Sequence, residues 1–69
     1  MEQLEKVRKR IRLARLEKDF TQDYVGDRLC MTQKSYHRLE TGKSQLKLDI
    51  LFKLATILEV EVSYFFKGL

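Results

Sequence analysis

The chain has 69 residues, of which 43% are hydrophobic and 35% charged, and its formal net charge is +4. This length fits one small domain with barely enough apolar residues for a core, and the composition excludes a disordered chain. Three glycines and no proline leave few chain breaks, which favours helices over a β-sandwich. The excess of Lys and Arg favours a polyanionic partner, although a solvated basic surface explains the charge equally well.

Several functional classes find little support in the sequence. Cys30 is the only cysteine, so an internal disulfide is excluded, and Cys30 with His37 gives too few soft ligands for a zinc site. No Gly-rich phosphate loop or catalytic constellation occurs, so we expect neither an enzyme nor a bound cofactor or metal. No signal segment or apolar run approaches the roughly 18 residues of a membrane span, so we expect a cytoplasmic protein with no membrane partner.

Residues 2–18 are predicted to form a long first helix. Its apolar residues recur at spacings of three and four: Leu4, Val7, Ile11 and Ala14. This spacing places them on one inward face. Arg15 falls on the same face, so its charge needs a partner. Leu13 and Leu16 lie away from this stripe, where they either meet a partner or are exposed.

Two short helices are expected next, with a very short junction. Thr21 is a good N-cap for a helix through about Leu29, and Thr32 caps another over residues 33–40. Gly42 can adopt the positive φ common just beyond a helix end. The inward-facing residues of the two helices are Val25, Leu29, Tyr36 and Leu39.

The rest of the chain predicts one further helix and a short apolar element. A polar loop over 43–47 precedes a helix over about 48–58, and residues 62–66 form a fifth helix or a turn. The core stripe of the 48–58 helix is Leu51, Leu54, Ala55 and Leu58. We therefore expect an all-α fold.

The short junction between the second and third helices indicates a function. It forces the two helices to cross at a large angle, so that the third projects and can enter a DNA major groove. The outward residues of the third helix are Gln33, Lys34, His37 and Arg38. Arg suits guanine and Gln suits adenine, but the same residues taken alone also suit a solvated helix face.

Four segments together carry a family resemblance. They are Ile11-Arg12…Arg15, then Phe20-Thr21-Gln22…Val25-Gly26…Leu29, then Met31-Thr32…Ser35-Tyr36…Leu39-Glu40…Gly42-Lys43, and last Leu48…Leu51…Leu54-Ala55…Leu58…Val60. With them, residues 11–66 resemble the helix-turn-helix domain of phage repressors and Cro proteins, the xenobiotic-response-element family. The resemblance implies a single domain over residues 1–69. It also implies a compact five-helix bundle with its helix-turn-helix at residues 21–40.

The resemblance also implies roles for individual residues. Those expected to contact DNA phosphates are Gln22, Thr41, Lys43 and Ser44. Those expected to read base edges are Gln33, Lys34 and Arg38, with His37 on the same surface. Arg15 and Glu40 are expected to form a buried ion pair that ties the first helix to the third.

Some positions depart from the family pattern. Gly26 stands where alanine is usual, and such a glycine is tolerated where another helix approaches closely. Cys30 stands where glycine is usual, so a strained turn is expected; the residue is either a small structural one or a redox switch. Leu46 replaces a proline. Tyr36 replaces a smaller aliphatic residue, and its hydroxyl is expected to reach water or a phosphate.

The resulting hypothesis is a transcriptional regulator, with repression the expected outcome. It would bind double-stranded DNA sequence-specifically as a homodimer, with half-sites about 34 Å apart. Candidate dimer-surface residues, which could equally complete the core, are Ile50, Ile57, Val62 and Phe66. The alternative is a protein-interaction module, such as an antitoxin with a toxin partner, or an accessory subunit.

Overall fold

The computed structural model describes residues 2–69, with side chains from Gln3 onward. Its elements are α1 (Glu2–Glu17), α2 (Gln22–Arg28), α3 (Gln33–Thr41), α4 (Leu48–Leu58) and a short 3₁₀ helix, η1 (Val62–Phe66). No strand occurs in this part of the chain. The all-α fold and the order of its helices are confirmed, and the fifth element is a 3₁₀ helix rather than a full α-helix.

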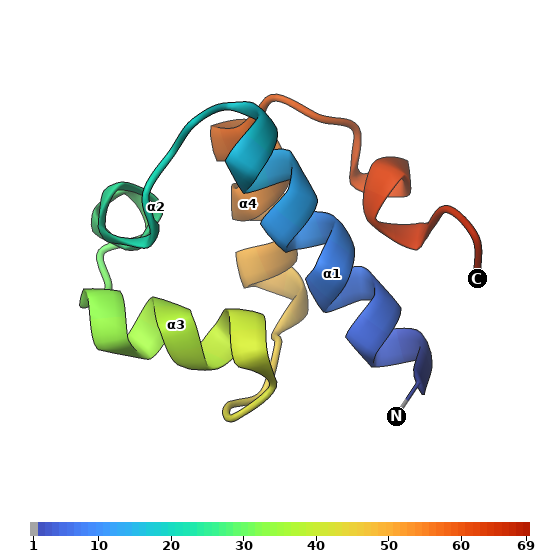
Figure 1. Cartoon of the computed structure of the whole chain (residues 1–69), viewed down its shortest axis with the longest axis horizontal. Helices are drawn as coiled ribbons and strands as arrows, with labels where there is room; N and C mark the ends of the chain where they lie inside the picture. Colours follow the sequence, from blue (N-terminus) through green and yellow to red (C-terminus); the bar gives the residue numbers. More distant parts are fainter. Residues whose placement is uncertain (1) are drawn as a thin grey trace.

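The long helix α1 lies between the other elements (Figure 1). It contacts α3 and α4, and it also contacts η1 near the carboxyl end of the chain. Figure 1 shows α3 and η1 on opposite sides of α1. The fold therefore gives α1 two flanks, one against α3 and the other against η1.

Threonine caps begin both short helices. Thr21 Oγ1 accepts a hydrogen bond from the Tyr24 amide at 3.0 Å, and Thr32 Oγ1 accepts one from the Ser35 amide at 3.1 Å. Each cap satisfies a backbone N–H that has no partner within its helix. Both predicted N-caps are thus present, and they explain where α2 and α3 begin.

Each of the four α-helices of the described chain is followed, within two residues of its end, by a residue of left-handed conformation. These residues are Asp19, Cys30, Gly42 and Glu59, with φ values of 58°, 60°, 87° and 59°. Among them only Gly42 avoids the steric cost that a Cβ incurs in this conformation. The strained turn expected at Cys30 is therefore present.

The core collects the apolar faces of all five elements. Its buried residues are Val7, Ile11, Ala14, Val25, Leu29, Tyr36, Leu39, Leu51, Leu54, Ala55, Leu58 and Phe65. The prediction for Leu4 was wrong, since this side chain is 41% exposed. Leu4 lies near the start of α1, where it faces only an open hollow shared with Phe66 and Leu69.

Tyr36 also differs from expectation, because its side chain is completely buried and its hydroxyl reaches neither water nor a phosphate. The reason is the close approach of α2 and α3 at Gly26. A Cβ placed on Gly26 would lie 3.3 Å from the Tyr36 Cβ and 3.2 Å from the Thr32 carbonyl oxygen. The absence of a side chain at Gly26 lets the two helices close over Tyr36.

The remaining apolar residues divide between core and surface. Ile50, Ile57 and Val62 pack against the core, whereas Phe66 is 42% exposed. Leu13 and Leu16 are exposed as well. No helix of the described residues is long and apolar enough to cross a membrane.

Candidate nucleic-acid interface

The junction between α2 and α3 closes through backbone hydrogen bonds. The Cys30 amide donates to the Asp27 carbonyl at 3.0 Å, and the Met31 amide donates to the Gly26 carbonyl at 2.8 Å. These two bonds form the Schellman arrangement, which reverses the chain in very few residues. Figure 1 looks along α2 while α3 runs across the view, so the two helices cross at a large angle.

The outward face of α3 presents polar and basic side chains. The exposed residues here are the four expected to read bases: Gln33, Lys34, His37 and Arg38. Their positions in the helix, two adjacent pairs four residues apart, place them on one face. Both amide and guanidinium groups are therefore available where base edges would lie.

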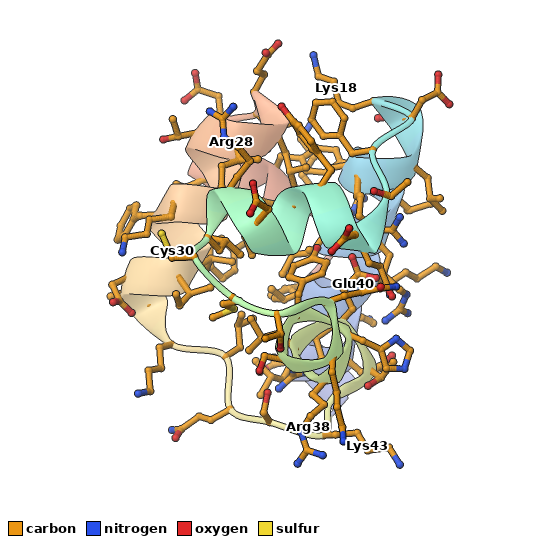
Figure 2. All side chains as sticks on the ribbon, turned by 90° about the vertical axis from the view of Figure 1, so that its left-hand side faces the viewer. Lys18, Arg28, Cys30, Arg38, Glu40 and Lys43 are labelled. Carbon is orange, nitrogen blue, oxygen red and sulfur yellow. The ribbon has the colours of Figure 1, made fainter. Side chains whose placement is uncertain are left out.

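The loop after α3 lies beside this face. Arg38 Nη2 is 3.4 Å from the Lys43 carbonyl oxygen, and Figure 2 shows both side chains at the same edge of the molecule. Lys43 is exposed and Ser44 is half-buried. Thr41 is exposed, but its hydroxyl donates to the His37 carbonyl at 2.9 Å, so it must give up this bond before its one O–H can donate to a phosphate.

Gln22 links the start of α2 to α3. Its Nε2 donates to Glu40 Oε1 at 3.1 Å, and its Oε1 lies 3.2 Å from His37 Nδ1. The second N–H of the amide makes no bond to another described residue, so it is free for an external acceptor such as a phosphate. Gln22 thus fixes His37 as well as standing at the edge of the candidate interface.

Arg15 and Glu40 form a hydrogen-bonded ion pair between α1 and α3. Arg15 Nε lies 2.6 Å from Glu40 Oε2, and Arg15 Nη2 lies 3.2 Å from Oε1. A third bond runs from Arg15 Nη1 to the Phe20 carbonyl at 2.9 Å. Burial alone would raise the pKa of Glu40, but polar neighbours that stabilise the carboxylate, the hydrogen-bonded Arg15 foremost, outweigh it and lower that pKa. Glu40 is therefore a buried carboxylate that stays charged at neutral pH.

Two further arginines of α1 hold α3, and sequence reasoning missed both. The buried Arg8 guanidinium donates to the Leu39 carbonyl and, at 3.1 Å, to the Ser44 carbonyl. Arg12 Nη1 donates to the Glu40 carbonyl at 2.6 Å. The last carbonyls of a helix lack partners within it and carry partial negative charge, so cations fit there.

A signal for this cluster was present in the sequence. Arg8, Arg12 and Arg15 are spaced by four and three residues, which places them on one side of α1. We call them the α1 arginine row. The row holds the C-terminal end of α3 on the side opposite its exposed face, and so orients the face that carries Arg38.

The described residues include no group of three or more His, Cys, Asp or Glu side chains that could hold a metal ion. Cys30 is exposed and free. The exposed face of α3 offers hydrogen-bond donors and positive charge on a projecting helix. Together with the α2–turn–α3 geometry, this defines a helix-turn-helix domain.

The comparisons with known proteins agree with this class. Residues 11–65 match the helix-turn-helix family model, and the chain belongs to that family, of the xenobiotic-response-element type. A similar protein is the SPbeta prophage-derived uncharacterized HTH-type transcriptional regulator YonR of Bacillus subtilis strain 168, at 34% identity over 59 residues. That match covers 86% of this chain and 55% of the relative, so the chain spans about half the relative's length. No solved structure matches the chain.

Proposed function

We propose that the chain binds double-stranded DNA sequence-specifically, with α3 in the major groove, and that it regulates transcription. The observation that carries this proposal is the exposed row of Gln33, Lys34 and Arg38 on a helix held rigidly from behind by α1. Family membership and a relative named as a transcriptional regulator support it. Arg38 and Gln33 would read base edges, while Gln22, Lys43 and Ser44 would contact phosphates.

A selection from random duplexes at two salt concentrations tests this proposal. We expect enrichment of one motif, with binding that weakens steeply as salt rises because phosphate contacts release counterions. Arg38→Ala should weaken binding to the enriched motif by about tenfold or more, the cost of one lost base contact. Lys53→Ala, which removes an exposed charge on α4, should leave the preference intact. Binding without enrichment, equally strong in Arg38→Ala, would reduce α3 to a generic basic surface.

The finer parts of the proposal concern assembly and the direction of control. We propose a homodimer on a two-fold operator, with Phe66 as the leading contact because it alone among the four candidate residues stays largely exposed. A two-fold symmetric motif in the selection would support it, and Phe66→Glu should then halve the mass in sedimentation. If the wild-type protein sediments as a monomer and the enriched motif lacks two-fold symmetry, the homodimer proposal is wrong. Repression is the direction we propose, tested by transcription from a promoter that overlaps the motif.

The same proposal covers the remaining expectations. We propose that residues 1–69 fold as a single domain that acts by binding rather than by catalysis, inside the cytoplasm. Limited proteolysis tests the first point, since a single domain should resist cleavage between its helices. An early cut within α1 or α4 would contradict it.

A further inference from the structure

The flank of α1 that faces away from α3 holds a basic hollow of about 330 Å³. Its lining residues are Lys6, Lys9, Arg10, Leu13, Lys67 and Gly68. Four of these six residues are cations. Figure 1 shows the carboxyl end of the chain beside α1, on the side of α1 away from α3. The proposed DNA surface therefore does not use these charges.

Arg10 is the fixed element of the basic hollow. It is half-buried, and its guanidinium carbon lies 5.1 Å from the centre of the Tyr64 ring. Such a cation–π contact orients the guanidinium without consuming its N–H donors. In the described structure Arg10 makes no hydrogen bond or ion pair, unlike every arginine of the α1 arginine row.

The other cations of the basic hollow are also without described partners. The ion pairs among the described side chains join Arg12 to Glu5, Arg15 to Glu40 and Lys18 to Glu59. None of them involves Lys6, Lys9 or Lys67. The hollow thus concentrates positive charge that no described carboxylate neutralises, which favours an anionic occupant.

Apolar surface continues from the hollow along α1. Leu13 lines the hollow and is 40% exposed, and Leu16 follows three residues later at 57% exposed. Neither joins the core, and both lie on the outward face of the same helix. A phosphate group would use the cations and leave these leucines in water, whereas a protein segment with both carboxylates and apolar side chains uses both features.

We propose that the basic hollow and the adjoining Leu13–Leu16 surface bind an acidic amphipathic helix of another protein. Carboxylates of that helix would meet Arg10, Lys6 and Lys9, and its apolar side chains would cover the two leucines. Because the surface lies across α1 from α3, partner and DNA bind together. The domain would then recruit a protein to the site it occupies, or be controlled by one.

A synthetic helical peptide tests this proposal directly. The probe has 16 residues, the length of α1, with Glu on one face and Leu on the adjoining face; a scrambled peptide of the same composition is the control. Binding is measured by fluorescence anisotropy, and backbone amide shifts locate the surface. We expect the segregated peptide to bind and to shift residues of the hollow, and the scrambled peptide to bind at least about tenfold more weakly, since its carboxylates and leucines cannot align.

Matched variants distinguish binding at this surface from nonspecific electrostatic attraction and nonspecific hydrophobic contact. Arg10→Gln should weaken peptide binding by about tenfold, because charge-assisted hydrogen bonds are lost, and Lys9→Gln should weaken it in the same direction. Lys53→Gln, an exposed cation on α4, should change it by less than about twofold. Leu13→Gln should weaken binding, whereas Leu48→Gln on α4, where Leu48 is 65% exposed, should not.

Several outcomes would overturn the proposal. These are equal binding of the two peptides, an equal loss in Lys53→Gln, or displacement of the peptide by inorganic phosphate alone. Duplex DNA that shifts Lys6, Lys9 and Arg10 would make the hollow a second DNA contact instead. The result is independent of the proposed function: Arg38→Ala should keep peptide binding while losing the DNA motif, and Arg10→Gln should do the reverse.

Discussion

The guanidinium of Arg8 donates a hydrogen bond to the main-chain carbonyl of Leu39, 31 residues further along the chain. The same side chain donates to the Ser44 carbonyl at 3.1 Å and is only 5% exposed. Arg8 thus joins the last turn of α3 to the loop that follows it. A buried cation at these carbonyls holds both of the elements that would flank DNA.

Replacing Arg8 should therefore destabilise the fold. Arg8→Met keeps much of the apolar stem but leaves the Leu39 and Ser44 carbonyls without their charged donor. We expect a loss of about 2–4 kcal/mol in the free energy of unfolding, because hydrogen bonds to charged groups are lost at a buried site. Urea unfolding followed by circular dichroism measures it. Lys9→Met removes an exposed charge from the neighbouring position and should cost less than about 0.5 kcal/mol. Equal losses in the two variants would show that the buried hydrogen bonds of Arg8 do not stabilise the fold.

The Arg15–Glu40 pair should make stability fall in acid. The pKa of Glu40 is lowered in the folded state, so the folded chain binds fewer protons than the unfolded chain just below the ordinary value of 4.5. The contribution of the charged Glu40 to the free energy of unfolding is therefore fully present above about pH 4.5. It is lost as the pH falls through the lowered pKa. A carbon-13 titration of the Glu40 carboxyl should show a midpoint below 4.5.

The control for this titration is Glu59, because the exposed ion pair with Lys18 lowers its pKa as well. Glu59→Gln should leave most of the acid dependence of unfolding in place. Glu40→Gln should flatten that dependence and cost about 2 kcal/mol or more at neutral pH, since Arg15 loses its charged partner. A Glu40 midpoint at or above the ordinary value would refute the assignment.

The helices were predictable because their signals are local. Threonine caps at Thr21 and Thr32, the glycine at Gly42 and the apolar spacing predicted elements whose ends the structure matches to within about one residue. Arg15 was identified as needing a partner because a charge on an apolar face cannot remain unpaired. Local rules of this kind depend only on neighbours in the chain.

The features that were not predicted correctly from the sequence depend on contacts between distant segments. Leu4 follows the apolar spacing of α1, but periodicity does not tell where the opposing element ends. Arg8 lies at the edge of the same stripe. From sequence alone, a long arginine side chain is predicted to be exposed, because the α3 carbonyls that face it are not known. The burial of Tyr36 depends on how closely α2 approaches at Gly26, which the sequence alone leaves open.

Cys30 is a position where a substitution should stabilise the protein. It adopts φ of 60° after α2, where a Cβ is strained and glycine is not. We expect Cys30→Gly to raise the free energy of unfolding by about 0.5–1 kcal/mol, after the greater entropy of glycine in the unfolded chain is subtracted. Cys30→Ala keeps the Cβ and should bring no gain. If the alanine variant proved as stable as the glycine variant, backbone strain would not be the cause.

The hydroxyl of Tyr36 gives the last prediction. The side chain is fully buried, its hydroxyl makes no hydrogen bond to a described residue, and burial, followed by the neighbouring Glu40 carboxylate, raises its pKa. Burying an unpaired hydroxyl costs free energy, so Tyr36→Phe should keep the packing and leave stability equal or higher by up to about 1 kcal/mol. Tyr36→Leu, the matched control, removes ring volume as well and should cost about 2 kcal/mol or more through the cavity. A loss of about 1 kcal/mol in the phenylalanine variant would mean that the hydroxyl does bond a neighbour, and that the network around Glu40 includes it.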